Sequence, residues 1–269
     1  MPNVLKADGT IEPYDKNKLL SSIKRAGIPP KIHQQVIDHV KKNLYENIPT
    51  SEIYTHIEEF FTKGNDVYSK TKYSLKRAIM ELGPTGFPFE SYVSEILKAL
   101  GFDTEVGTFL IGNCVKHEVD VIAKNKNEKI MIECKFHNSP GIKSDLHVSL
   151  YTKARFEDLR KKHEFSHAML VTNTKISLDA LSYANCEGVR VLSWSYPEGE
   201  SLRDLIEKYK LYPLTQLSFL SLSQKQELLS QGFVLIKQIC KDPRILSKIT
   251  IPVNKREEII KEAATVCGI

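Results

Sequence analysis

The sequence lacks the features of a membrane-bound, exported or repetitive protein. No apolar run approaches the roughly 18 residues that span a membrane, and the N-terminus contains no apolar segment typical of a signal peptide. Low-complexity segments and internal repeats are also missing. We therefore expect a cytoplasmic protein that has no membrane partner.

Cysteine is scarce, and its spacing excludes a zinc ribbon. No two of the five cysteines form a C-x-x-C pair, their number is odd, and their surroundings are apolar. This pattern predicts reduced, mostly buried thiols at all five positions, which are Cys114, Cys134, Cys186, Cys240 and Cys267.

Length, composition and net charge indicate how many domains the chain has and which partners it can bind. The 269 residues, 41% hydrophobic and 26% charged, suit a globular protein with two domains and a small appendage. A net charge of +5 permits a nucleic-acid partner without requiring one. We expect the domains to cover residues 1–84, 85–210 and 211–269.

The most informative stretch is a pair of short apolar segments, 117–122 and 129–136, that carry charged residues. Side chains alternate between the faces of a strand, so Glu133 and Lys135 share one face of the second segment. If the turn between the segments centres on 126–127, antiparallel pairing places Asp120 directly across from Glu133. The sequence therefore predicts two carboxylates and an amine in one patch.

Two carboxylates this close repel each other unless a cation neutralises them. A hard divalent ion with oxygen ligands fits, and we expect Mg²⁺ or Mn²⁺ on Asp120 and Glu133. Lys135 would then orient or activate a bound water, or stabilise charge on a phosphate. The alternative is a solvated sheet face with an ordinary network of opposite charges.

Turn signals and apolar spacing in residues 1–84 predict a β-hairpin followed by four helices. Asp8-Gly9 is a strong turn signal within 4–13, and Asp15 suits the N-cap of the first helix. The segments VLKADGTIEPYDKNKLLSSIKRA and KTKYSLKRAI resemble the ATP-cone, a nucleotide-binding regulatory domain of ribonucleotide reductases. The resemblance implies an α+β domain that binds ATP or dATP through Val4, Lys6, Lys16, Lys18, Lys72 and Tyr73. Basic residues near a helix N-terminus also favour anions, whereas the alternative is a solvated, lysine-rich surface.

Residues 85–210 predict a mixed sheet flanked by helices on both sides. A helix over 87–100 precedes strands at 104–110, 115–123 and 129–136, then a helix at 144–162. A strand, a helix and a further strand follow at 167–172, 178–185 and 189–194. Glu90 borders the buried side of the first helix, and a first-turn acid favoured by the helix dipole is the ordinary interpretation of this residue.

This order of elements resembles the PD-(D/E)xK nuclease fold, and within it the Mrr-like branch of type IV restriction endonucleases. The resemblance rests on FPFESYVSEILKALGF, HEVDVIA, KIMIECKFH, HAMLVTNTKISLDALSYA and VRVLSW, which occur in the family's order. It implies an α/β restriction-endonuclease-like domain in which Asp120 and Glu133 bind the metal, Lys135 serves the attacking water and Glu90 supports the site.

The helix predicted at 144–162 carries a possible nucleic-acid face. His147, Tyr151 and Arg155 recur at steps of four, with Lys143 and Lys153 nearby. Such a face suits DNA phosphates and base stacking, while the alternative is a solvated helix surface.

Residues 211–269 predict a small helical tail. The stretch 228–234 resembles a helix-hairpin-helix motif in which Gly232 lets the backbone approach a phosphate. A dimerisation or docking tail is an equally good interpretation.

Together these observations predict a metal-dependent DNA endonuclease, regulated by ATP or dATP and assembled as a homo-oligomer. The alternatives are a nucleotide-responsive nucleic-acid-binding regulator without cleavage activity and a module that ATP assembles into oligomers.

Overall fold

The computed structural model describes residues 2–6, 9–64, 66–139 and 141–268. The chain divides into two compact units, Met1–Lys76 and Arg77–Ile269, and each is described by itself. Ala7 and Asp8 of the predicted hairpin turn lie outside the described residues.

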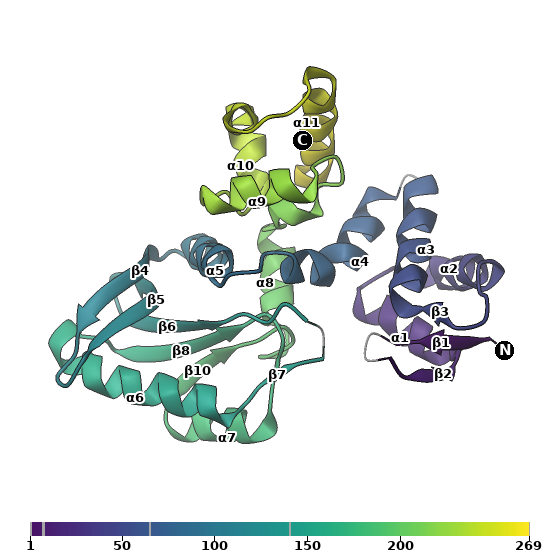
Figure 1. Cartoon of the computed structure of the whole chain (residues 1–269). Coiled ribbons are helices and arrows are strands. Elements are labelled where there is room, and N and C mark those ends of the chain that lie inside the picture. Colours follow the sequence, from purple (N-terminus) through teal and green to yellow (C-terminus); the bar gives the residue numbers. More distant parts are fainter. Residues whose placement is uncertain (1, 7–8, 65, 140, 269) are drawn as a thin grey trace. The chain divides into compact units, whose positions relative to one another are not determined.

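The first unit is a small sheet packed with helices, as the sequence predicted (Figure 1). Its strands are β1 (Asn3–Leu5), β2 (Ile11–Pro13) and β3 (Ile48–Pro49), in the order β2-β1-β3. Its helices are α1 (Lys16–Arg25), α2 (Pro30–Lys42), α3 (Thr50–Lys63) and the first part of α4 (Val67–Met80). The two-residue β3, which pairs in parallel with β1, is too short to give a periodic sequence signal.

Local chemistry explains the helices of this unit. The Asp15 carboxylate accepts a hydrogen bond from the backbone N–H of Asn17 at 2.7 Å and so caps α1. Val36 and Val40, one turn apart on α2, are completely buried in the unit's core. The apolar spacing seen in the sequence therefore marks the faces that pack together.

The second unit is built on a five-stranded mixed sheet (Figure 1). The strands β4 (Asp103–Ile111), β5 (Lys116–Lys124) and β6 (Lys129–Lys135) form an antiparallel meander, to which β8 (His167–Thr172) and β10 (Val189–Leu192) add in parallel. The strand order is β10-β8-β6-β5-β4. A separate parallel pair joins β7 (Lys143–Ser144) to β9 (Lys175–Ile176). The mixed sheet agrees with the prediction.

Helices cover both faces of this sheet (Figure 1). On one face, α6 (Leu146–His163) and α7 (Leu178–Cys186) bury an apolar cluster that includes Met131, Phe156 and Leu159. On the other face lies α5 (Phe87–Ala99), whose Phe89 ring is 5.5 Å from that of Phe136. Helices therefore pack on both faces of β6, as predicted for this sheet.

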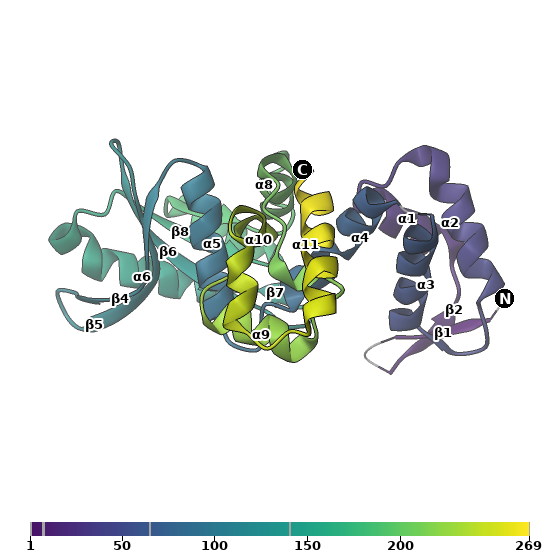
Figure 2. The ribbon, with the colours of Figure 1, turned by 90° about the horizontal axis from the view of Figure 1, so that it is seen from above.

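The last helices form a cluster of their own within the second unit (Figure 2). They are α9 (Leu222–Ser230), α10 (Ile236–Lys241) and α11 (Val253–Cys267), with 3₁₀ turns at Leu214–Gln216 and Pro243–Lys248, and they follow α8 (Leu202–Tyr209), which contacts α5. The Thr215 hydroxyl donates to the carbonyl of Ala78 at 2.6 Å, which ties this segment to the end of α4. The sequence analysis missed α8, whose signal is a capping box between Ser201 and Asp204.

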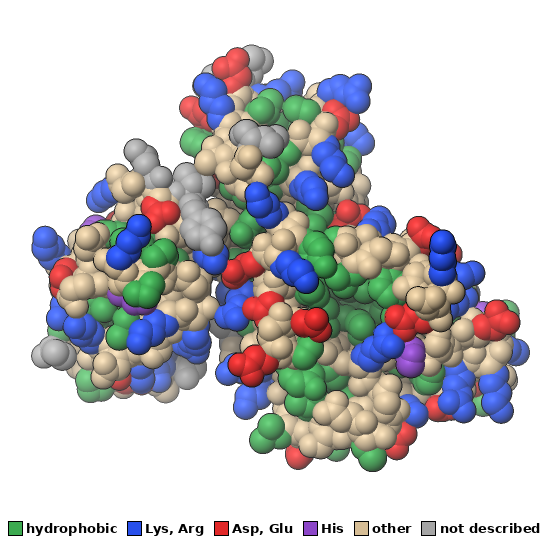
Figure 3. Space-filling model, turned by 180° about the vertical axis from the view of Figure 1, so that it is seen from behind, with side chains coloured by type: hydrophobic (Ala, Val, Ile, Leu, Met, Phe, Trp, Pro, Cys, Tyr) green, Lys and Arg blue, Asp and Glu red, His purple; other side chains and the backbone are tan. Residues whose placement is uncertain are grey.

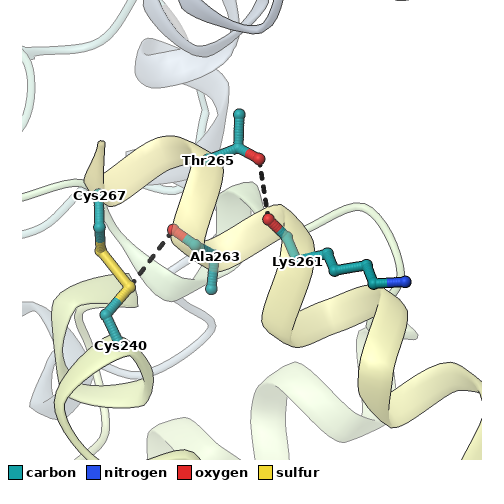
Figure 4. Close-up of a disulfide and its surroundings, with 5 residues drawn as sticks. All are labelled: Cys240, Lys261, Ala263, Thr265 and Cys267. Atoms are coloured by element: carbon teal, nitrogen blue, oxygen red, sulfur yellow. Dashed lines mark hydrogen bonds between the residues drawn. A yellow bond between two sulfur atoms is a disulfide. The ribbon is translucent and has the colours of Figure 1, made fainter. Parts of the chain in front are cut away.

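The cysteine prediction was wrong in two respects. Cys240 on α10 and Cys267 on α11 form a disulfide that joins these helices (Figure 4). Of the free cysteines, Cys114 and Cys186 are exposed and Cys134 is half-buried. The error has a physical reason, because the two bonded residues are 27 positions apart and only the fold of the tail brings them together.

The turn between α9 and α10 contains Gly232, whose φ of +81° favours glycine. The conformation of Gly232 does not test whether the backbone approaches a phosphate, so the helix-hairpin-helix assignment stays a prediction. None of the helices in the described ranges combines the length and the apolar composition that a membrane span requires.

Candidate active site

The site begins where β5 and β6 separate. The predicted register is confirmed in four pairs, from Val121 with Ile132 to Lys124 with Lys129. One step further along, Asp120 Oδ2 accepts a hydrogen bond from the backbone N–H of Cys134 at 2.7 Å. The carboxylate of Asp120 is thereby fixed to the strand that carries Glu133 and Lys135.

Strand β5 does not alternate strictly around Asp120. His117 bonds to Asp158 of α6 at 2.8 Å, and Val119 and Ile122 both join the apolar cluster beneath α6. Two residues three positions apart share a face only if the period of two is interrupted between them. The interruption lies opposite Gly107 of β4, whose φ of +64° departs from strand geometry. This local irregularity turns the Asp120 side chain toward β6.

The two predicted site residues of β6 have different environments. Glu133 is largely buried and pairs through Oε2 with Nη1 of Arg155 at 2.5 Å. Lys135, at the end of the strand, is exposed and forms no ion pair within the described ranges. Its amine therefore stays available for an anion from outside the chain.

Glu90 lies in the first turn of α5 and belongs to the same electrostatic group. Burial, and then the charges of Asp120, Glu118 and Glu133, raise its pKa to about 7. The dipole of a helix favours the charged form of a first-turn acid, but burial, reinforced by repulsion from the strand carboxylates, outweighs it here.

The strand carboxylates show the same effect. Burial, followed by the charge of Asp120, raises the pKa of Glu133 to about 7. Burial also raises the pKa of Asp120, against the hydrogen bond from the Cys134 N–H. The charge of Asp120 raises the pKa of both Glu90 and Glu133, so an added cation is favoured among these three acids.

The donor set suits a divalent cation with oxygen ligands. Oδ1 of Asp120 and Oε1 of Glu133 have no hydrogen-bond partner within the described part of the chain. Carboxylate oxygens are the ligands that Mg²⁺ prefers. Over the same residues, no three His, Cys, Asp or Glu side chains gather as a ready-made metal cluster, so the ligand assignment stays a prediction.

Two further residues belong to this site, and neither was predicted as part of it. The charge of Glu118 raises the pKa of Glu90. This contribution could have been predicted, because Glu118 lies two positions before Asp120 on the same predicted strand. The contact of Arg155 with Glu133 had no sequence signal, because it joins α6 to β6 across 22 positions.

The predicted nucleic-acid residues do not form one uniform surface. Lys143, His147 and Tyr151 are exposed. Lys153 instead pairs with Glu157 at 3.1 Å and with Glu187, and Arg155 is only 9% exposed. On the face shown in Figure 3, basic side chains intermingle with acidic ones rather than forming a continuous positive patch.

In the first unit, two of the predicted nucleotide ligands meet at one carboxylate. Glu12 accepts from Lys6 Nζ at 2.6 Å and from Lys18 Nζ at 2.8 Å, and these bonds lower its pKa. Lys18 also lines an open pocket of about 680 Å³ along α1. The pocket's other lining residues are Asp15, Asn17, Ser21, Lys24 and Arg25.

The other predicted nucleotide ligands make different contacts, although Val4 is the strand partner of Glu12. Lys16 donates to Gln34 of α2 at 3.2 Å, and Lys72 lies beside Gly27. Val4 and Tyr73 are both 5% exposed and belong to the unit's core. Their burial makes them parts of the scaffold in this conformation.

Family models match three consecutive segments of the chain. Residues 2–82 are an ATP cone domain, and residues 84–197 are a restriction endonuclease domain. Residues 212–267 match the C-terminal segment described as AF1548-like.

Similar proteins include one from Archaeoglobus fulgidus and a solved structure. The Archaeoglobus fulgidus protein is uncharacterized and is 38% identical over 177 residues, which are 65% of this chain and all of that protein. The crystal structure of AF1548, a protein of unknown function, is 36% identical with a TM-score of 0.61, and the match covers 69% of this chain and all of that one. The restriction endonuclease AspBHI matches at 12% identity with a TM-score of 0.35, over 59% of this chain and 38% of that one. The chain belongs to the AF1548-like family, in which it joins an ATP cone domain to a restriction endonuclease domain.

Proposed function

We propose that the protein is a metal-dependent DNA endonuclease whose activity responds to ATP or dATP. The observation that carries the proposal is the electrostatic group of Glu90, Asp120 and Glu133, with the exposed amine of Lys135 on the same strand as Glu133. The restriction endonuclease domain supports a nuclease, and the ATP cone domain supports nucleotide binding.

The residues of the site take distinct roles in this proposal. Asp120 and Glu133 hold a Mg²⁺ or Mn²⁺ ion, which supplies Lewis-acid activation of water and neutralises charge on the phosphate. The Cys134 N–H keeps Asp120 in place. Lys135 positions the attacking water or stabilises negative charge on the phosphate, and Glu90 adds negative charge at the edge of the site.

The substrate reaches this site along α6. Lys143, His147 and Tyr151 are exposed side chains of the kinds that bind phosphates and stack on bases. Lys153 and Arg155 are already paired with acids, so we assign them no direct part in the first contact with DNA.

One experiment tests the proposal. Plasmid DNA is incubated with the protein and Mg²⁺ or Mn²⁺, with and without ATP, beside Asp120→Ala. We expect nicked or linear DNA from the wild type in the presence of metal, no product from the variant, and a rate that changes with ATP. A gel shift without cleavage in either metal would instead favour a nucleotide-responsive DNA-binding regulator. Full activity of Asp120→Ala would remove the site assignment.

A further inference from the structure

Arg155 connects the buried acids to the surface of α6. Its Nη1 donates to Glu133 Oε2, and its Nη2 donates to the Tyr151 hydroxyl at 2.7 Å. The guanidinium carbon also lies 4.6 Å from the centre of the Tyr151 ring. Arg155 is 9% exposed, whereas Tyr151 is 54% exposed. A half-exposed tyrosine therefore holds a buried arginine against Glu133.

The pairing of Arg155 with Glu133 offsets negative charge among the neighbouring acids. Glu133 is surrounded by Asp120 of β5 and Glu90 of α5, while the nearby cations are Lys135 of β6 and Arg155 of α6. Of these two cations, only Arg155 touches Glu133 within the described residues. Removing one partner of a buried ion pair leaves the other charge uncompensated, so Arg155 and Glu133 depend on each other.

The hydrogen bond from Arg155 engages only one of the two carboxylate oxygens of Glu133. Arg155 engages Oε2 of Glu133, while Oε1 has no hydrogen-bond partner in the described ranges. The planar guanidinium is held by both a hydroxyl and a ring face of Tyr151, which fixes its direction. This geometry orients a carboxylate and leaves its second oxygen to bind another cation.

We propose that Arg155 is a positioning residue, which fixes Glu133 so that the carboxylate presents Oε1 to a divalent cation. The inference rests on the proposed function, because Glu133 must be a metal ligand. A competing arrangement, in which Arg155 occupies the place of the cation and must leave before it binds, makes the opposite prediction for metal affinity.

Mn²⁺ binding in the absence of DNA separates these arrangements. Titration calorimetry or electron paramagnetic resonance compares the wild type with Arg155→Gln, Arg155→Lys and Tyr151→Phe. We expect Arg155→Gln to weaken Mn²⁺ binding about tenfold or more, which is typical for loss of a residue that orients a ligand. Arg155→Lys keeps the charge and should recover part of the affinity. Tyr151→Phe loses only the hydroxyl acceptor and should show a smaller loss.

Arg160→Gln serves as the matched control, because Arg160 is an exposed residue of α6 that pairs with Glu157. Its Mn²⁺ affinity should equal that of the wild type. Equal or tighter binding by Arg155→Gln overturns the positioning role. If Arg155→Gln does not fold, unchanged binding by the surface variant Tyr151→Phe overturns it instead.

The two proposals fail in different ways. Wild-type protein that binds no Mn²⁺ overturns the proposed function together with this inference. Wild-type binding with an unaltered Arg155→Gln affinity overturns the inference alone.

Discussion

The side chain of Asp120 accepts a hydrogen bond from the backbone N–H of Cys134 at 2.7 Å. This bond lies just beyond the last register pair of β5 and β6, which is Val121 with Ile132. It joins an acid on one strand to the neighbour of both Glu133 and Lys135 on the next. The bond therefore fixes the position of Asp120 relative to Glu133 and Lys135 beyond the last paired residues of the two strands.

Lys135→Ala should remove cleavage while leaving the fold intact. Loss of one donor that stabilises developing charge typically costs about 10²–10³ in rate. Because Lys135 is exposed, its removal should change the free energy of unfolding by no more than about 0.5 kcal/mol. Plasmid nicking and thermal unfolding measure the two effects.

Lys124→Ala, which removes another exposed lysine from the far end of β5, should cleave like the wild type. Equal activity of both variants would contradict the role of Lys135.

The raised pKa of Glu133 predicts how stability depends on pH. Burial raises this pKa from 4.5 to about 7, so the folded protein binds more protons than the unfolded chain in this interval. The contribution of Glu133 to stability is therefore present below about pH 4.5 and is lost as the pH rises through about 7. Thermal unfolding of wild type and Glu133→Gln in EDTA measures the difference. The variant should lose less stability over this interval, and parallel curves would show that Glu133 titrates normally.

Nucleotide binding should depend on Lys18 and be restrained by Glu12. The Glu12 carboxylate already pairs with Lys6 and Lys18, so a phosphate must compete with it for both amines. We expect Lys18→Ala to weaken ATP binding and Glu12→Gln to strengthen it, both measured by titration calorimetry. Lys31→Ala, which removes an exposed lysine of α2, is the control. Weaker binding by Glu12→Gln would show that Glu12 orients the lysines instead of competing for them.

Reduction of the disulfide should destabilise the tail. The bond between Cys240 and Cys267 closes a loop with a sequence separation of 27, for which the chain-entropy model gives about 3.5 kcal/mol. Cys267→Ser should therefore lower the unfolding temperature, and a reducing agent should lower that of the wild type but not of the variant. Cys186→Ser alters an exposed free cysteine and should behave as the wild type. Identical unfolding of all three proteins would contradict a stabilising role for the bond.

Local patterns in the sequence determined most of the fold. Apolar residues with a period of two or near 3.6 identified the five strands of the large sheet and α1 to α7, because burial of one face imposes that spacing. The register of β5 and β6 also followed from the sequence, since a short turn leaves few ways to pair two alternating strands. These two facts were enough to place Asp120, Glu133 and Lys135 near one another.

Tertiary structure decided what each of these side chains contacts. The pairing of Arg155 with Glu133, the disulfide between Cys240 and Cys267, and the charge of Glu118 near Glu90 join residues on separate elements. A repeat of four along α6 put Arg155 on a presumed solvent face, but packing against β6 buried it. The sequence determines which face of an element is apolar, whereas the partner of a polar side chain depends on which elements pack beside it.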